Sequence, residues 1–141
     1  MSKITVNAFI FHENRLLLIN HKKTKIWMHP GGHVKENEFF DDALKREIKE
    51  EVNLDVDIIG EDLFGKETKF LELKKPFFIH GNPNNKDIAL DYVCVAKEPI
   101  NIRLDETELS DFKWVAEEEI DKQDMPDLLK DLIKKAFQSY K

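Results

Sequence analysis

The stretch of sequence that decides the fold is GGHVKENEFFDDALKREIKEEVNL, residues 31–54. It places Glu47, Glu50 and Glu51 within five residues, shortly after a Pro-Gly-Gly loop. A helix advances about 100° per residue, so side chains three and four apart share one face. Like charges on one face destabilise a helix by roughly 0.2–0.5 kcal/mol per pair. Because carboxylate oxygens suit hard divalent cations, the pattern points to Mg²⁺ or Mn²⁺ as the compensating charge.

Length and composition indicate one globular domain over residues 1–141. The chain has 141 residues, of which 41% are hydrophobic and 35% charged, which predicts a soluble protein with one core. The net charge of −6 argues against binding to long nucleic acid, which requires basic side chains against phosphates. It remains compatible with a small phosphorylated substrate, because a bound metal reverses the local field.

Targeting signals and disulfides are not expected from this sequence. No apolar run approaches the roughly 20 residues that span a bilayer, and the N-terminus is typical of a strand rather than a signal peptide. The single cysteine, Cys94, lies in an apolar run and is predicted to be a buried, inert thiol. These features favour a cytoplasmic location.

The periodicity of apolar residues predicts a mixed α/β fold. Strands are expected at residues 4–10, 15–20, 54–64, 69–73, 77–80, 88–96 and 110–115, and helices at residues 39–52 and 126–140. This order of elements favours an α/β/α sandwich, in which a mixed sheet packs between helices, over a doubly wound sheet.

The ends of the first predicted helix carry recognisable signals. Asn37 or Glu38 stands at its start, and Asp41 and Asp42 complement the positive end of its dipole. Asn53 follows the last turn, where an asparagine tolerates the left-handed conformation of a helix cap.

The spacing of residues 32–54 resembles the Nudix box of MutT-like Nudix hydrolases. The matching positions are Gly32, Glu38, Arg46, Glu47, Ile48, Glu50, Glu51 and Leu54. One position departs from the box, since Asn53 stands where the family has a glycine. Because asparagine also adopts a positive φ, we expect the backbone to be preserved there.

The resemblance implies metal-dependent hydrolysis of a nucleoside diphosphate linked to another group. It assigns Glu47, Glu50 and Glu51 as ligands of Mg²⁺ or Mn²⁺, with one of them as a possible general base. It assigns Arg46 the task of orienting a neighbouring carboxylate. It also gives Glu38 a structural role at the junction of loop and helix.

Further ligands are implied outside the helix. The backbone carbonyl of Gly31 is a candidate metal ligand, and so is an acidic side chain from a later loop. Glu108 is the candidate for that side chain, with Glu106 as the alternative.

Substrate contacts are less narrowly defined. The candidates are Trp27, His33, Asp91 and Tyr92, and for each of them core packing or plain solvent exposure is the alternative. The substrate class stays open between (d)NTPs, nucleotide sugars and compounds like ADP-ribose, acted on by a monomer or a homodimer. A nucleotide-binding sensor with the same fold and little catalysis is the alternative function.

Overall fold

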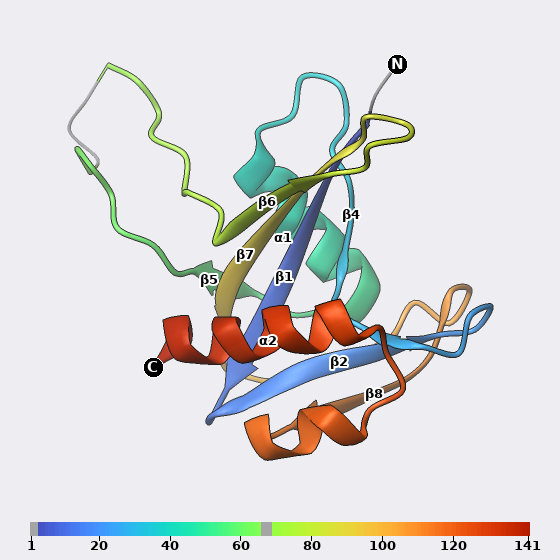
Figure 1. Ribbon diagram of the computed structural model, residues 1–141. Coiled ribbons are helices and arrows are strands. Elements are labelled where there is room, and N and C mark those ends of the chain that lie inside the picture. The colour runs from blue at the N-terminus through green and yellow to red at the C-terminus, as the bar shows by residue number, and fades with distance from the viewer. Residues whose placement is uncertain (1–2, 66–68) are drawn as a thin grey trace.

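The computed structural model describes residues 3–65 and 69–141, which form one mixed β-sheet with an α-helix on each face (Figure 1). In chain order, the elements are β1 (Ile4–His12), β2 (Arg15–His21), β3 (Trp27–Met28), β4 (Gly31–His33), α1 (Phe40–Val52), β5 (Val56–Ile58), β6 (Phe78–Gly81), β7 (Ile88–Ala96), β8 (Leu109–Val115), the 3₁₀-helix η1 (Glu117–Lys122) and α2 (Asp127–Tyr140). The predicted α/β sandwich is therefore confirmed.

The sheet is organised around β1 and β7, which pair in parallel from Ile4↔Ile88 to Phe11↔Val95. The other edge of β1 is shared by β4, near the start of the strand, and by β2, at its end. β2 continues the sheet to β3 and β8, and the outer edge of β7 is shared by β5 and β6. This division of β1 places the short strand β4 beside α1.

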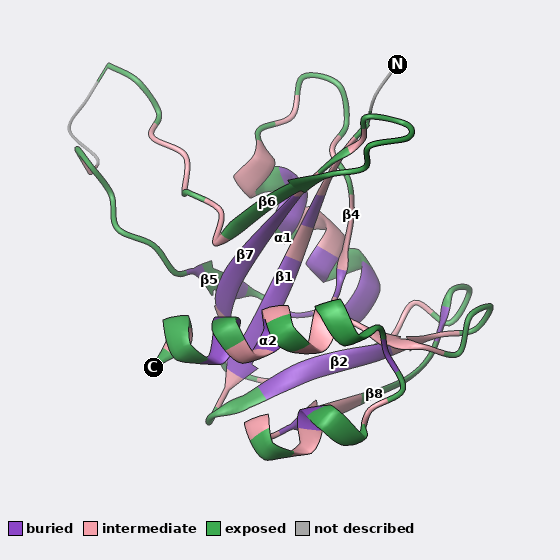
Figure 2. Cartoon of the chain, viewed as in Figure 1, coloured by how far each residue is buried: buried purple, intermediate pink, exposed green. Residues whose placement is uncertain are grey.

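Alternation along the central strands divides the core into two layers. Val6, Ala8 and Ile10 of β1 face the layer that contains the apolar side of α1. Phe9 and Phe11 face the layer that contains α2. Figure 2 shows that β1 and β2 are buried over much of their length, and burial on both faces explains the apolar runs 8–11 and 16–19.

The first helix forms where predicted, but its start differs. α1 begins at Phe40 after Phe39, whose backbone is extended and whose side chain provides no cap. Asn37 or Glu38 was expected at its start, but the N-cap residue is Phe39, and the Glu38 carboxylate accepts a hydrogen bond from the Lys35 amide. The predicted left-handed cap at Asn53 is confirmed, with φ 61° and ψ 39°.

Two predicted strands are absent or shortened among the described residues. The strand expected at 54–64 is confined to β5, and residues 69–73 form no strand. A strand needs a partner, and the outer edge of β7 is already used by β5 and β6. The apolar side chains of this segment stay in water, with exposed fractions of 67–81% at Leu63, Phe64, Phe70 and Leu71.

The remaining predicted elements agree with the structure to within about two residues at their ends. Three short elements were not predicted: β3, β4 and η1. Cys94 is buried and free, as expected, and burial raises the pKa of its thiol to about 12. Neither α-helix of the described chain combines the length and the apolar character needed to cross a bilayer.

Asn53 gives a direct test of the helix cap. Asn53→Ala should lower the free energy of unfolding by about 1 kcal/mol, because alanine is strained at positive φ. Asn53→Gly should cost less, since glycine removes the strain and loses only the 2.9 Å hydrogen bond from the side chain to the Asn101 carbonyl. Urea denaturation measures both, and equal losses would contradict the cap assignment.

Candidate functional site

The free edge of β4 faces α1. β4 pairs with β1, and hydrogen bonds from the Ala8 amide to the Pro30 carbonyl and from the Val34 amide to the Ile4 carbonyl flank this pairing. Because bonded residues alternate along an antiparallel strand, the backbone polar groups of Gly31 and His33 point away from β1. The amide of Gly31 donates to a carboxylate oxygen of Glu51 at 2.8 Å. The carbonyl of His33 accepts from the Arg46 guanidinium at 3.0 Å. Since the amide and carbonyl of one strand residue share a side, the Gly31 carbonyl also faces α1.

Close packing, rather than a tight bend, explains the two glycines. Neither Gly31 nor Gly32 has a positive φ, and both belong to β4, so the Pro-Gly-Gly sequence forms the start of a strand rather than the expected loop. A Cβ at Gly31 would collide with the backbone of Val6 and Asn7. A Cβ at Gly32 would collide with the carboxylate of Glu47. Glycine thus lets α1 bring its carboxylates against a strand backbone.

Arg46 is the hub of the carboxylate network. Its guanidinium binds both oxygens of Glu38, at 2.8 and 3.0 Å, and one oxygen of Glu47 at 2.9 Å. The same nitrogen that binds Glu47 lies 3.4 Å from Glu50. The hydrogen bonds that Glu38 accepts from Arg46 and from the Lys35 amide lower the pKa of Glu38 to about 2. Arg46 therefore orients neighbouring carboxylates in this structure, and Glu38 holds Arg46.

Glu51 is the glutamate that carries uncompensated charge. Its side chain is 6% exposed, and burial is the main cause that raises its pKa to about 7. The hydrogen bond from Gly31 opposes this rise, whereas the negative charges of Glu47, Glu108 and Asp105 add to it. A positive charge at this position would relieve both the burial cost and the repulsion.

The loop before β8 brings acidic side chains toward Glu51. The Asp105 amide donates to the Glu51 backbone carbonyl at 2.9 Å, and the Glu108 carbonyl accepts from the Lys22 amide at 2.9 Å. The negative charges of Asp105 and Glu108 both raise the pKa of Glu51, although Glu108 is exposed, as Glu106 is. Of the two predicted acids, Glu108 is thus the one whose charge acts at the site. Asp105 was not predicted, although it belongs to the same acidic segment.

The three glutamates of α1 lie along the β4 edge without meeting at one point. Glu47 turns to Arg46, and Glu51 turns to Gly31. Glu50 is the freest of them, with 56% of its side chain exposed. This distribution leaves Glu50 available to a ligand in solvent, while the other two are oriented by the protein.

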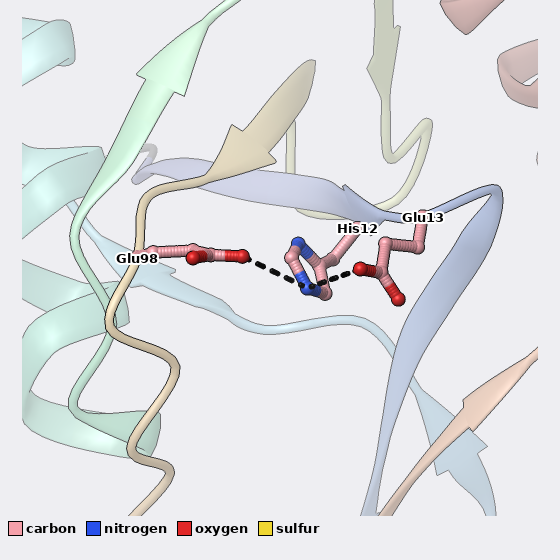
Figure 3. Close-up of side chains that lie close together, drawn as sticks. All are labelled: His12, Glu13 and Glu98. Carbon is pink, nitrogen blue, oxygen red and sulfur yellow. Dashed lines mark ion pairs between the residues drawn. The ribbon is translucent and has the colours of Figure 1, made fainter.

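A separate group of possible metal ligands lies at the far end of β1. Figure 3 shows the imidazole of His12 between the carboxylates of Glu13 and Glu98, with Nε2 3.9 Å from an oxygen of each. His12 is five residues along β1 from Asn7, which pairs with Gly31, so the two places are about 17 Å apart. Both glutamates are largely exposed. The group contains none of the predicted ligands and is separate from the candidate site.

The predicted substrate contacts are scattered. Trp27 packs against the α2-side core with the Lys113 ammonium 4.0 Å from its ring centre, and the His33 side chain is exposed. Tyr92 lies in the α1-side core, where burial raises its pKa to about 12. Asp91 is buried as well. For Trp27, Tyr92 and Asp91 these positions favour packing over direct contact with substrate.

The raised pKa of Glu51 predicts a pH effect on stability. Its folded-state pKa of about 7 lies above the unfolded value of 4.5, so the metal-free protein should lose stability as the pH rises from about 4.5 through 7. Glu51→Gln should remove this loss. Its free energy of unfolding relative to that of the wild type should therefore rise with pH, by about 1–3 kcal/mol between pH 5 and 8. Denaturation with chelator at several pH values tests this, with Glu118→Gln as the exposed control. A pH-independent difference would contradict it.

Comparison with known proteins bears on the family and the fold of this chain. The family model for the NUDIX domain matches residues 1–136. Nudix hydrolase 2 of Arabidopsis thaliana is 28% identical over 124 residues, which cover 83% of this chain and 40% of that protein. This chain spans less than half the length of the curated relatives that it matches.

Solved structures show the same fold. A NUDIX-family hydrolase from Clostridium perfringens superposes with a TM-score of 0.81 at 24% identity, over 98% of this chain and 97% of that one. A MutT NUDIX hydrolase from Burkholderia pseudomallei gives a TM-score of 0.62 at 20% identity, over 100% and 99% of the two chains. These structures share the fold, and the family match across residues 1–136 establishes that the chain belongs to the Nudix hydrolase family.

Proposed function

We propose that this protein hydrolyses the pyrophosphate linkage of a nucleoside diphosphate derivative with the help of Mg²⁺ or Mn²⁺. The observation that carries the proposal is the row of carboxylates of Glu47, Glu50 and Glu51 on the face of α1 that lies against the β4 edge. Membership of the Nudix family supports the same reaction. Family members act on small nucleotides, so a small nucleotide is the expected partner.

The residues present fit a hard divalent cation. Every donor is an oxygen, and the buried Glu51 lacks a positive partner of its own, since its only side-chain hydrogen bond in the described structure comes from the Gly31 amide. We assign Glu47, Glu50, Glu51 and the Gly31 carbonyl as ligands, with Glu108 as the additional acid. A bound cation supplies positive charge that offsets the charge of the pyrophosphate and favours deprotonation of the attacking water.

The side chains around the proposed metal site have different roles in the reaction. Arg46 holds the Glu47 carboxylate in one orientation through a 2.9 Å hydrogen bond, and Glu38 in turn fixes Arg46 with two hydrogen bonds. Glu50 is exposed and only loosely held. One of the three glutamates of α1 accepts the proton of the water that attacks phosphorus, and a P–O bond of the pyrophosphate then breaks. Fixed orientation of the reacting groups lowers the barrier because less freedom is lost during reaction.

Substrate identity is best read from the products. The panel includes (d)NTPs, nucleotide sugars and ADP-ribose-like compounds, each with Mg²⁺ or Mn²⁺. Release of a nucleoside monophosphate from at least one of them supports the proposal. Tight nucleotide binding without turnover across the panel would support the nucleotide sensor instead.

Glu50 tests the proposed chemistry most cleanly, because its removal disturbs few contacts. Glu50→Gln should lower the turnover rate on the best substrate by at least about a hundredfold, as expected when a key charged group is lost. Glu118→Gln removes an exposed carboxylate on η1 and should leave the rate unchanged. Circular dichroism checks that both variants fold. Full activity of Glu50→Gln would refute the assigned site.

Gly32 tests the close approach of α1 to β4. Gly32→Ala should displace the Glu47 carboxylate, which is the end of a flexible side chain, so the fold should survive. We expect Mn²⁺ affinity, measured by calorimetry, to fall by about tenfold or more. Gly60→Ala is the matched control, because its added Cβ would come no closer than 3.9 Å to another atom. Unchanged Mn²⁺ affinity in Gly32→Ala would argue against Glu47 as a ligand.

A further inference from the structure

Two acidic side chains are buried among the described residues: Glu51 and Asp91. Glu51 belongs to the proposed site. Asp91 is 1% exposed and has no part in the reaction proposed above. Removing a carboxylate from water costs several kcal/mol unless close partners compensate for it, so the contacts of Asp91 require an explanation.

Histidines lie at both oxygens of Asp91. Nε2 of His29 lies 3.2 Å from Oδ1 in a hydrogen bond. Nε2 of His80 lies 3.0 Å from Oδ2, which is an ion-pair distance without hydrogen-bond geometry. His29 is nearly buried, whereas about half of the His80 side chain is exposed. Asp91 therefore has one interior partner and one at the surface.

The ring of His29 is held in a single orientation. It stacks on Phe9 with the ring centres 4.5 Å apart and the planes 9° from parallel. Because Asp91 can only accept, Nε2 of His29 carries the proton of their hydrogen bond. The stacking fixes the plane of the ring, and the hydrogen bond fixes its rotation within that plane.

His29 is two residues before Gly31, so both buried carboxylates hold the same short segment. Asp91 binds the side chain of His29, the first residue of the segment, and Glu51 accepts a hydrogen bond from the amide of Gly31, the last residue, at 2.8 Å. Pro30, between them, accepts a hydrogen bond from the Ala8 amide at 2.8 Å. The segment 29–31 is thus tied to α1, to β1 and to β7.

The register explains how the two carboxylates reach one segment. Asn7 of β1 pairs with Gly31 on one side and with Asp91 on the other, so the three residues form one row across the sheet. Asp91 lies on the face of Phe9, which belongs to the α2-side layer. Glu51 comes from α1, on the opposite face. The segment is therefore held from both faces of the sheet.

We propose that Asp91 is a positioning residue of the candidate site, which acts through His29 to fix the backbone of Gly31. The amide of Gly31 then meets Glu51, and its carbonyl stays at the edge that faces α1. The consequence for catalysis rests on the proposed function, but the placement of Gly31 does not. His80 lies at the surface beside the other oxygen of Asp91 and does not hold the segment.

Amide hydrogen exchange of the metal-free protein tests the placement without any substrate. In Asp91→Asn, exchange of the Gly31 amide should accelerate by about tenfold relative to the amides of α1, because a neutral amide oxygen accepts a weaker hydrogen bond from His29 than a carboxylate does and the segment is loosened locally. His29→Gln should give the same local change, and His80→Gln should not. Val93→Ala is the matched control, since it removes packing on the same face of β7 and leaves in place the hydrogen bonds described above for residues 29–31.

The same variants also test the consequence for catalysis. Asp91→Asn should lower kcat and Mn²⁺ affinity by about tenfold with little change in KM, in the range seen when a residue that supports a ligand is lost. Unchanged Gly31 exchange in Asp91→Asn, or an equal local change in Val93→Ala, would overturn the proposal. If the wild type hydrolyses nothing in the panel, the proposed function fails, and the exchange experiment still decides the role of Asp91.

Discussion

The hydrogen bond from the Gly31 amide to the Glu51 carboxylate is the contact on which the site depends. It ties the edge of β4 to the last turn of α1, and it forms only because Gly31 and Gly32 have no side chains in the way. β4 has 3 residues and pairs with only the first part of β1. The fold thus places a strand backbone, with its own carbonyl, beside a row of carboxylates.

Charge along this edge is balanced unevenly. The repulsion between neighbouring glutamates on a helix is worth roughly 0.2–0.5 kcal/mol per pair, whereas a hydrogen bond to a charged group contributes about 1.5–3 kcal/mol. Arg46 therefore offsets the repulsion at Glu47 through its hydrogen bond, and Glu38 takes up much of the remaining charge of Arg46. Glu51 is left buried without a cation. The local need for positive charge is thus concentrated at one residue.

The sequence predicts the helix and its acidic face, because both depend on local spacing, and the Asn53 cap follows from the chemistry of one residue. It does not predict β4, whose Gly-Gly sequence is typical of a turn and which becomes a strand only through β1 and α1. It also fails at residues 69–73, which contain apolar side chains but form no strand. Asp91 was predicted as a substrate contact. Its contacts with His29 and His80 join residues far apart in the sequence, so the sequence does not show them.

Burial of two carboxylates beside one three-residue segment has an energetic consequence. Replacing a buried ion pair by well-packed apolar groups is often neutral or stabilising, and a buried carboxylate without a cation is costlier still, so Asp91 and Glu51 are poor choices for stability alone. Both instead restrict a backbone segment whose position decides where Gly31 meets α1. A site that binds a cation through fixed oxygens gains from such restriction, because ligands that are already oriented lose less freedom when they bind. The free energy lost by burying the two carboxylates is therefore offset in function, because the carboxylates hold the segment 29–31 from both faces of the sheet.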